Sequence, residues 1–261
     1  MKIIKIPGIN GMGRTNGCEK APESILNALD DVWSNEQGKI VDRRLAEIYE
    51  IKVNNSNIEE SLNEIEKKAW KILKDEKCLF LGGDHSISFP ILKAFKEESE
   101  KDKFLIVFDA HADCMPRMPE PSHEEWLRAL VEQGFSARNI ILLGLRNVWQ
   151  SELEFLREKN IRAYWMKNME DKESICDAIM EMAQGKELYV SIDIDVLDPA
   201  FAPGTGFCEP GGMSSRELLY YAHRLAMLNN LKAIDIVEVN PSKDTSGRTS
   251  KIAAKILAEF L

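Results

Sequence analysis

Positive charge and long apolar runs are both scarce in this sequence, and each deficit argues against a class of partner. Its 261 residues include 34 Lys and Arg against 43 Asp and Glu, for a formal net charge of −9 at pH 7. Nucleic acids and anionic membranes attract basic surfaces, so we expect neither as a partner. No apolar run approaches the roughly 20 residues that a transmembrane helix needs. The acidic balance is instead compatible with a cationic small molecule.

Cysteine is used sparingly and without a recognisable pairing pattern. The five cysteines are odd in number and include no Cys-x-x-Cys pair, which is typical of reduced thiols in a cytoplasmic protein. The apolar start of the chain, Met1–Ile6, is broken by Pro7-Gly8 and is too short for a signal peptide. We therefore expect a cytoplasmic location.

The apolar pattern predicts alternating strands and helices in a single catalytic domain over residues 1–261. A chain of this length with 44% apolar residues can build one large α/β core. Strands that alternate with amphipathic helices imply parallel strands joined by right-handed crossovers. Eight such strands could close as a barrel or stay open between helix layers, and the pattern alone leaves both open. The expected strands are 2–6, 39–42, 77–82, 104–109, 140–145, 161–166, 188–194 and 231–238. The expected helices are 21–30, 57–74, 88–98, 124–133, 149–159, 172–184, 214–228 and 246–260.

The segment 191–199, SIDIDVLDP, is the most informative stretch. It continues a predicted buried strand, and two acids, Asp193 and Asp195, alternate with apolar residues. Residues i and i+2 of a strand share a face and lie roughly 6.6 Å apart, so both carboxylates should point the same way. Two carboxylates beside a core are unfavourable without a positive charge between them, and no Lys or Arg lies in this stretch. A metal ion would supply that charge. The alternative is a half-exposed antiparallel strand with its acids in water.

Two further apolar strands end in possible metal ligands. The run 104–108, FLIVF, leads into Asp109, His111 and Asp113, which would share one face if the chain stayed extended. The strand around 77–81 breaks at Gly82-Gly83 and leads to His85. Carboxylate and imidazole ligands together suit Mn²⁺, Fe²⁺, Ni²⁺ or Zn²⁺. Because the carboxyl ends of parallel strands meet at one edge of a sheet, these residues predict a metal site there.

The order of these segments resembles the ureohydrolase family, which includes arginase and agmatinase. The matching motifs are GGDHS at 82–86, DAHAD at 109–113, SIDIDVLDP at 191–199 and VEVNP at 237–241. The segments 17–25 and 203–212 are similar to the family's first helix and to its loop after the acidic strand, so nearly the whole chain is covered. The resemblance implies an arginase-like three-layer α/β/α sandwich with a largely parallel eight-stranded sheet.

The resemblance also implies two Mn²⁺ ions per chain. One ion would be held by His85, Asp109, Asp113 and Asp193. The other would be held by Asp109, His111, Asp193 and Asp195, so that Asp109 and Asp193 bridge. In such a centre two ions roughly 3.5–4 Å apart hold a shared water and lower its pKa, and the bridging hydroxide attacks the guanidinium carbon.

Three catalytic roles follow from motif position. Asp113 would pass a proton to the leaving amine, and Glu238 would accept two hydrogen bonds from the guanidinium edge. His123 would be a proton shuttle that titrates near neutrality. Where family members have His-Gly or His-Ala, this chain has Ser122-His123-Glu124, which alters the pocket. The alternative for His123 is a cap at a helix N-terminus.

We therefore expect a binuclear manganese amidinohydrolase that releases urea, with agmatine converted to putrescine as the leading reaction. The segment after Asp113 lacks the Asn and Ser with which arginase-like members bind an α-amino carboxylate. Glu120 or Glu124 would favour a cationic tail. Arg117 could equally meet a carboxylate, which keeps arginine, guanidino acids and formiminoglutamate open.

Two alternative hypotheses assign the protein to other functional classes. One is a single-zinc deacylase of a related fold, and the other is a non-catalytic metal-binding or regulatory homologue. The resemblance further implies a homo-oligomer, a trimer or a hexamer.

Overall fold

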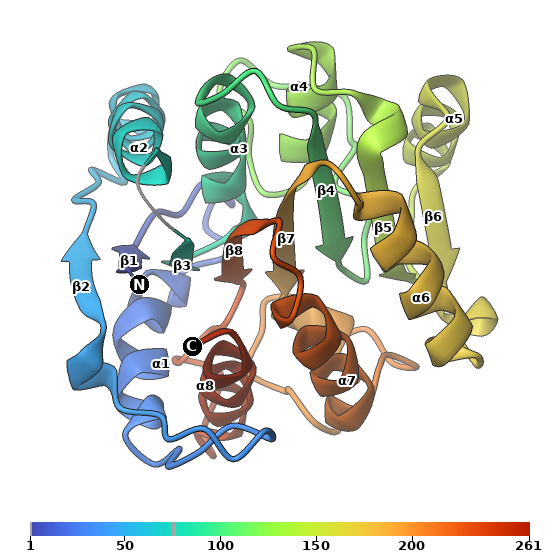
Figure 1. The fold of residues 1–261 in the computed structure, drawn as a ribbon. Coiled ribbons are helices and arrows are strands. Elements are labelled where there is room, and N and C mark those ends of the chain that lie inside the picture. Colours follow the sequence, from blue (N-terminus) through green and yellow to red (C-terminus); the bar gives the residue numbers. More distant parts are fainter. Residues whose placement is uncertain (1, 75–76) are drawn as a thin grey trace.

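Eight strands form one sheet in the order β2-β1-β3-β8-β7-β4-β5-β6 (Figure 1). The computed structural model describes residues 2–74 and 77–261. Every pairing between neighbouring strands is parallel. The strands are β1 (Lys2–Ile6), β2 (Glu47–Glu50), β3 (Cys78–Gly82), β4 (Lys103–Phe108), β5 (Ile140–Leu145), β6 (Arg162–Trp165), β7 (Glu187–Asp193) and β8 (Leu231–Val237). The predicted open parallel sheet is confirmed, and the barrel is not formed.

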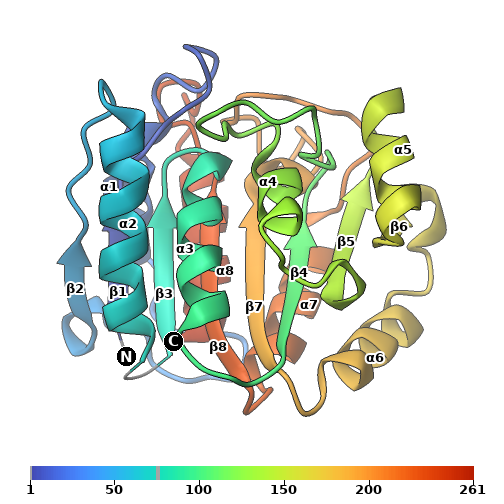
Figure 2. The same cartoon turned by 90° about the horizontal axis from the view of Figure 1, so that it is seen from above.

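Helices cover both faces of the sheet and complete the three layers (Figures 1 and 2). One layer contains α2 (Ile58–Leu73), α3 (Ser88–Glu97), α4 (Trp126–Glu132) and α5 (Gln150–Lys159). The other contains α1 (Ala21–Leu29), α6 (Lys172–Ala183), α7 (Ser215–Ala226) and α8 (Arg248–Phe260). All eight predicted helices are present, with ends within about two residues of the prediction. Within the described residues, no helix is long and apolar enough to cross a membrane.

Alternate residues of each central strand enter opposite cores. In β4, Phe104, Ile106 and Phe108 pack with the α1/α6/α7/α8 layer, whereas Leu105 and Val107 pack with the other layer. A strand that is covered on both faces needs apolar side chains at every position, which explains its unbroken apolar run. The two cores therefore hold the central strands rigidly and fix the positions of their carboxyl ends.

The strand predicted at 39–42 is wrong. Ile40 makes only an isolated antiparallel bridge with Ser34, and the second strand of the chain is β2. The Asp42 side chain accepts a hydrogen bond from the Arg44 N–H and starts a 3-10 turn, which ends the extended segment. The sequence does not predict β2, because it is an edge strand whose four residues are all exposed. Burial therefore imposes no alternation of apolar and polar residues on it.

The four strands that carry the ligand motifs are neighbours in the sheet. β3, β8, β7 and β4 lie side by side in that order. The register pairs Phe108 of β4 with Ile192 of β7, and Asp193 of β7 with Val237 of β8. The residues that follow these positions therefore emerge together at one edge of the sheet, where ligands gather in open α/β sheets.

Candidate metal centre and active site

The structure brings all six predicted metal ligands together at the carboxyl edge of the sheet. His85 lies in a 3-10 turn after β3, and Asp193 is the last residue of β7. The expected extended geometry does not hold beyond the strand ends. Asp195 lies in a 3-10 turn at Ile194–Val196, and Asp113 has a positive φ of 48°. The chain bends after each strand, and these bends turn the carboxylates toward one another.

The first cluster surrounds one ring nitrogen of His85. Its Nδ1 lies 3.2 Å from Asp109 Oδ2, 3.1 Å from Asp113 Oδ2 and 3.2 Å from Asp193 Oδ2. All four groups are buried, and the Nδ1 atom has no hydrogen-bond partner. A single proton on this nitrogen could not serve three carboxylates. A divalent cation that accepts one nitrogen and several oxygen ligands fits the arrangement.

The second cluster shares Asp109 with the first. His111 Nδ1 lies 3.0 Å from Asp195 Oδ2 and 3.5 Å from Asp109 Oδ1. The two oxygens of Asp109 thus face different clusters, Oδ2 toward His85 and Oδ1 toward His111. In both clusters, one ligand atom from each of three residues lies within 4.8 Å of the others. This sharing is the arrangement that a bridging carboxylate needs. Asp193 differs, because its Oδ1 accepts a hydrogen bond from the Asp195 N–H at 2.8 Å.

A buried relay sets the tautomer of His85. Asp235 accepts hydrogen bonds from the hydroxyls of Ser88, Tyr189 and Ser191, the last at 2.6 Å. Because the Ser191 hydroxyl gives its proton to Asp235, its oxygen accepts from His85 Nε2 at 2.9 Å. A proton on Nε2 leaves the lone pair of Nδ1 directed at the three carboxylates, as a metal ligand requires.

Burial and mutual repulsion act strongly on the acids of the site. Burial, with Asp109 beside it, raises the pKa of Asp113 to about 7. Burial, followed by the charges of Asp195 and Asp109, raises the pKa of Asp193 well above its usual value. For His85, burial alone would lower the pKa, but the surrounding carboxylates raise it well above 6.5. Burial and the neighbouring negative charges both disfavour ionised carboxylates here, and bound cations would relieve this repulsion.

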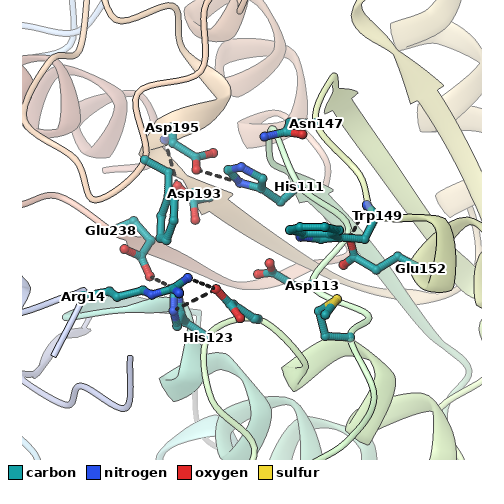
Figure 3. A pocket seen from close by; sticks show the side chains of 13 residues that line it. Arg14, His111, Asp113, His123, Asn147, Trp149, Glu152, Asp193, Asp195 and Glu238 are labelled. Atoms are coloured by element: carbon teal, nitrogen blue, oxygen red, sulfur yellow. Dashed lines mark hydrogen bonds and ion pairs between the residues drawn. The ribbon is translucent and has the colours of Figure 1, made fainter. Parts of the chain in front are cut away.

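Glu238 and His123 form the wall beside the clusters (Figure 3). Glu238 follows β8 with φ at 64°, and its Oε1 accepts from the His85 backbone N–H at 2.9 Å. The Nδ1 atom of His123 lies 3.6 Å from the same Oε1. The His123 ring stacks on Phe207 with centroids 5.6 Å apart, and its buried Nε2 has no hydrogen-bond partner. Burial lowers the pKa of His123. His123 therefore faces the pocket, and α4 begins three residues later, at Trp126.

A cavity of about 150 Å³ opens over the clusters. Its lining residues are Arg14, His111, Asp113, Met115, His123, Glu124, Asn147, Trp149, Glu152, Asp193, Asp195, Phe207 and Glu238. Glu124 does line it, but its Oε1 is paired with an Arg14 guanidinium nitrogen at 3.1 Å. Glu120 and Arg117 are exposed and stand outside this lining. Neither of them is therefore placed to meet the tail of a substrate in this cavity.

Arg146 holds the turn that presents Asp195. Its guanidinium donates to the carbonyl of Asp195 at 2.6 Å and to those of Val196, Leu197 and Glu209 at 2.8 to 3.3 Å. Gly144 allows this turn to approach β5, because a Cβ there would lie 2.4 Å from Val196 Cγ2, and its φ is 103°.

The sequence did not indicate the contacts of Arg146, the Asp235 relay, Arg14 or Glu152. Each acquires its role through contacts distant in sequence, so no local pattern marks them.

Comparison with known proteins agrees with this geometry. The sequence profile described as "Arginase family" matches residues 1–261. The agmatinase of Bacillus subtilis (strain 168) is 35% identical over 235 residues, which are 87% of this chain and 79% of that protein. The mitochondrial arginase 1 of Oryza sativa subsp. indica is 31% identical, covering 99% of this chain and 79% of that protein. The crystal structure of formimidoylglutamase from Bacillus subtilis superposes with a TM-score of 0.89 at 28% identity, covering 99% of this chain and 84% of that one. The chain therefore belongs to the arginase family.

Proposed function

We propose that this protein hydrolyses agmatine to putrescine and urea with two Mn²⁺ ions. As a member of the arginase family it is a hydrolase of guanidino C–N bonds. The observation that carries the proposal is the pair of clusters that share Asp109, with Glu238 directly beside them. This arrangement offers a place for two cations and, next to it, a carboxylate for the guanidinium group.

The residues present fit two divalent cations. His85, Asp109, Asp113 and Asp193 would hold the first, and Asp109, His111, Asp193 and Asp195 would hold the second. When bound, such a pair lowers the pKa of a water molecule so that it can attack a carbon at neutral pH. The mixture of imidazole and carboxylate ligands is compatible with Mn²⁺.

The protein's own residues supply orientation and proton transfer. Glu238 would accept hydrogen bonds from the two N–H groups along the guanidinium edge, which aligns the carbon with the clusters. When the bond between that carbon and the tail nitrogen breaks, Asp113 would give a proton to the departing amine. The other proton of the attacking water would pass to solvent through His123, since its Nε2, which has no hydrogen-bond partner, and its neutral ring suit a relay.

Agmatine is favoured by the charges at the outer end of the cavity. Arg14, the one cationic Lys or Arg side chain in the described lining, is already paired with Glu124 at 3.1 Å. A carboxylate tail would therefore meet a guanidinium whose charge Glu124 already balances. The cavity of about 150 Å³ suits a small substrate. The agmatinase relative at 35% identity supports the same choice.

The surface and the thiols support two further inferences about the protein's state. Trp33, Ile40 and Leu45 are 81%, 72% and 81% exposed, and Trp33 and Ile40 line one groove. Large exposed apolar side chains favour association, so we infer a homo-oligomer. The resemblance to the family, not this surface, favours a trimer or a hexamer. All five cysteines are free, as is typical of the reducing cytoplasm, where we expect the protein to act.

The test is urea release by Mn²⁺-loaded protein from agmatine, arginine and guanidinobutyrate, with formiminoglutamate followed by formamide release. We expect agmatine to give the highest kcat/KM. If another of these compounds gave the highest kcat/KM, that compound would replace agmatine as the proposed substrate, and the proposed reaction class would stand. Two bound metals per chain without turnover of any compound would contradict the proposal and favour a non-catalytic homologue.

A further inference from the structure

Trp149 has an unusual position for a large aromatic residue. It lines the cavity, yet it is 70% exposed, whereas most large aromatic side chains of this protein are buried. Figure 3 shows its ring extending into the pocket beside His111 and Asp113. Its backbone is fixed, because the Trp149 N–H donates to Glu152 Oε2 at 2.9 Å at the start of α5. An indole face held open at the mouth of a pocket is available to a ligand.

The carboxylate behind this indole lacks a positive partner. Glu152 is 3% exposed, and its oxygens accept the backbone N–H groups of Cys114 and Trp149. No ion pair within the described part of the chain involves it. Two divalent cations would balance Asp109, Asp113, Asp193 and Asp195, Glu238 would be matched by the guanidinium, and Glu124 is matched by Arg14. Among the described acidic residues that line the cavity, Glu152 is then the one without a positive partner, and it lies at the Trp149 side.

We propose that Trp149, with Glu152 behind it, forms the subsite for a cationic tail and makes the protein selective for ammonium-tailed guanidino substrates. The inference rests on the proposed function and names the residues that determine its specificity. An ammonium group over an indole face is attracted by the ring quadrupole, and a nearby buried carboxylate strengthens that attraction. A methyl group of the same size gains the apolar contact but neither electrostatic component.

The test uses two compounds that differ only at the end of the tail. Agmatine carries an ammonium group where pentylguanidine carries a methyl group, and both have the same guanidinium and chain length. The wild-type protein is compared with Trp149→Leu, which keeps an apolar wall, and with Trp149→Phe, which keeps a weaker aromatic face. Because Trp149 is exposed, all three proteins should fold alike, as circular dichroism would verify.

We expect Trp149→Leu to lower kcat/KM for agmatine by roughly 2- to 30-fold, mainly through KM, and to affect pentylguanidine much less. Trp149→Phe should lie between the other two proteins. An equal loss for both compounds would overturn the inference while leaving the proposed function intact.

If the wild type hydrolysed neither compound, the proposed function would fail. The Kd values of the two compounds from calorimetry would then decide the inference separately. A selective loss of agmatine affinity in Trp149→Leu would support it, and an equal loss or no loss would overturn it.

Discussion

The Trp126 indole N–H donates a 2.7 Å hydrogen bond to Asp113 Oδ2. The same oxygen lies 3.1 Å from His85 Nδ1, and the Trp126 ring lies 4.5 Å from the His85 ring between centroids. Trp126 is fully buried. Asp113 itself has a positive φ of 48°, and the indole N–H holds its carboxylate in this orientation. One side chain thus orients a predicted ligand and packs against another.

Trp126→Phe should weaken the first metal site, beyond the moderate loss of stability expected where a buried ring becomes smaller. The phenyl ring keeps the packing against His85 and removes the N–H donor. Loss of a hydrogen-bonding partner behind a metal ligand typically costs 10- to 100-fold in metal affinity, which is the range we expect for one of the two ions. Chelator competition with Mn²⁺ would measure it.

The matched control for this change is Trp70→Phe, the same substitution on α2 at a half-exposed position with Lys74 over its ring. It should leave both metal affinities unchanged. Wild-type affinity in Trp126→Phe would show that the indole N–H does not orient Asp113.

Ser191→Ala should also weaken metal binding, through the tautomer of His85. Without the hydroxyl, the Nε2 proton of His85 loses its acceptor and the preference for a free Nδ1 weakens. We expect a loss of about 10- to 100-fold in metal affinity. Ser88→Ala is the matched control, because Ser88 donates to the same Asp235 carboxylate and is equally buried. Equal affinities in the two variants would argue against the relay.

The predictions from sequence succeeded where a local pattern carries the information. A strand buried on both faces has an unbroken apolar run, and a ligand placed directly after it is easily located, as at Asp109 and Asp193. They failed where tertiary packing decides. Asp235 has the pattern of a solvated acid in a strand, but the structure buries it under three hydroxyl groups from α3 and β7. Residues far apart in the sequence converge there, so no spacing within one segment could indicate the relay.

The pocket wall illustrates the same limit. The sequence predicts that Glu120 or Glu124 favours a cationic tail, yet Arg14, which is 110 positions away in the sequence, pairs with Glu124. Glu152, which a helical pattern places on an amphipathic helix, is instead buried beside the cavity. The net charge of a pocket depends on residues from several loops, so it can be assessed only when the positions of those loops are known.

Asp193→Asn should abolish metal binding and turnover together. The change removes one negative charge from a carboxylate whose Oδ2 lies 3.2 Å from His85 Nδ1, where a cation would be held. Metal content per chain after dialysis against Mn²⁺ would be measured alongside urea release. Asp171→Asn is the control, since it makes the same chemical change at the exposed N-cap of α6, where an amide oxygen can still accept the Ser174 N–H. Full activity in Asp193→Asn would contradict the ligand assignment.

Below about pH 6.5, His123 should make the folded protein less stable as the pH falls. Burial lowers the pKa of His123 in the folded protein below its ordinary value of 6.5. Over that interval the unfolded chain binds a proton that the folded protein does not, so the free energy of unfolding falls as the pH falls. His123→Gln removes this contribution. The difference in unfolding free energy, wild type minus variant, should therefore decrease as the pH is lowered from 7.5 to 5.

Urea denaturation at constant Mn²⁺ would measure this difference, in which contributions common to both proteins cancel. The opposite slope would contradict this prediction. It is a real alternative because the charges of Asp84, Glu124 and Glu125 act to raise the pKa of His123. If their attraction exceeded the effect of burial, wild type would gain stability relative to the variant on acidification. The pKa of His123 in the folded protein would then lie above 6.5, and the neutral resting ring assumed for the relay would be wrong. The sign of this slope therefore tests the protonation state on which the role of His123 depends.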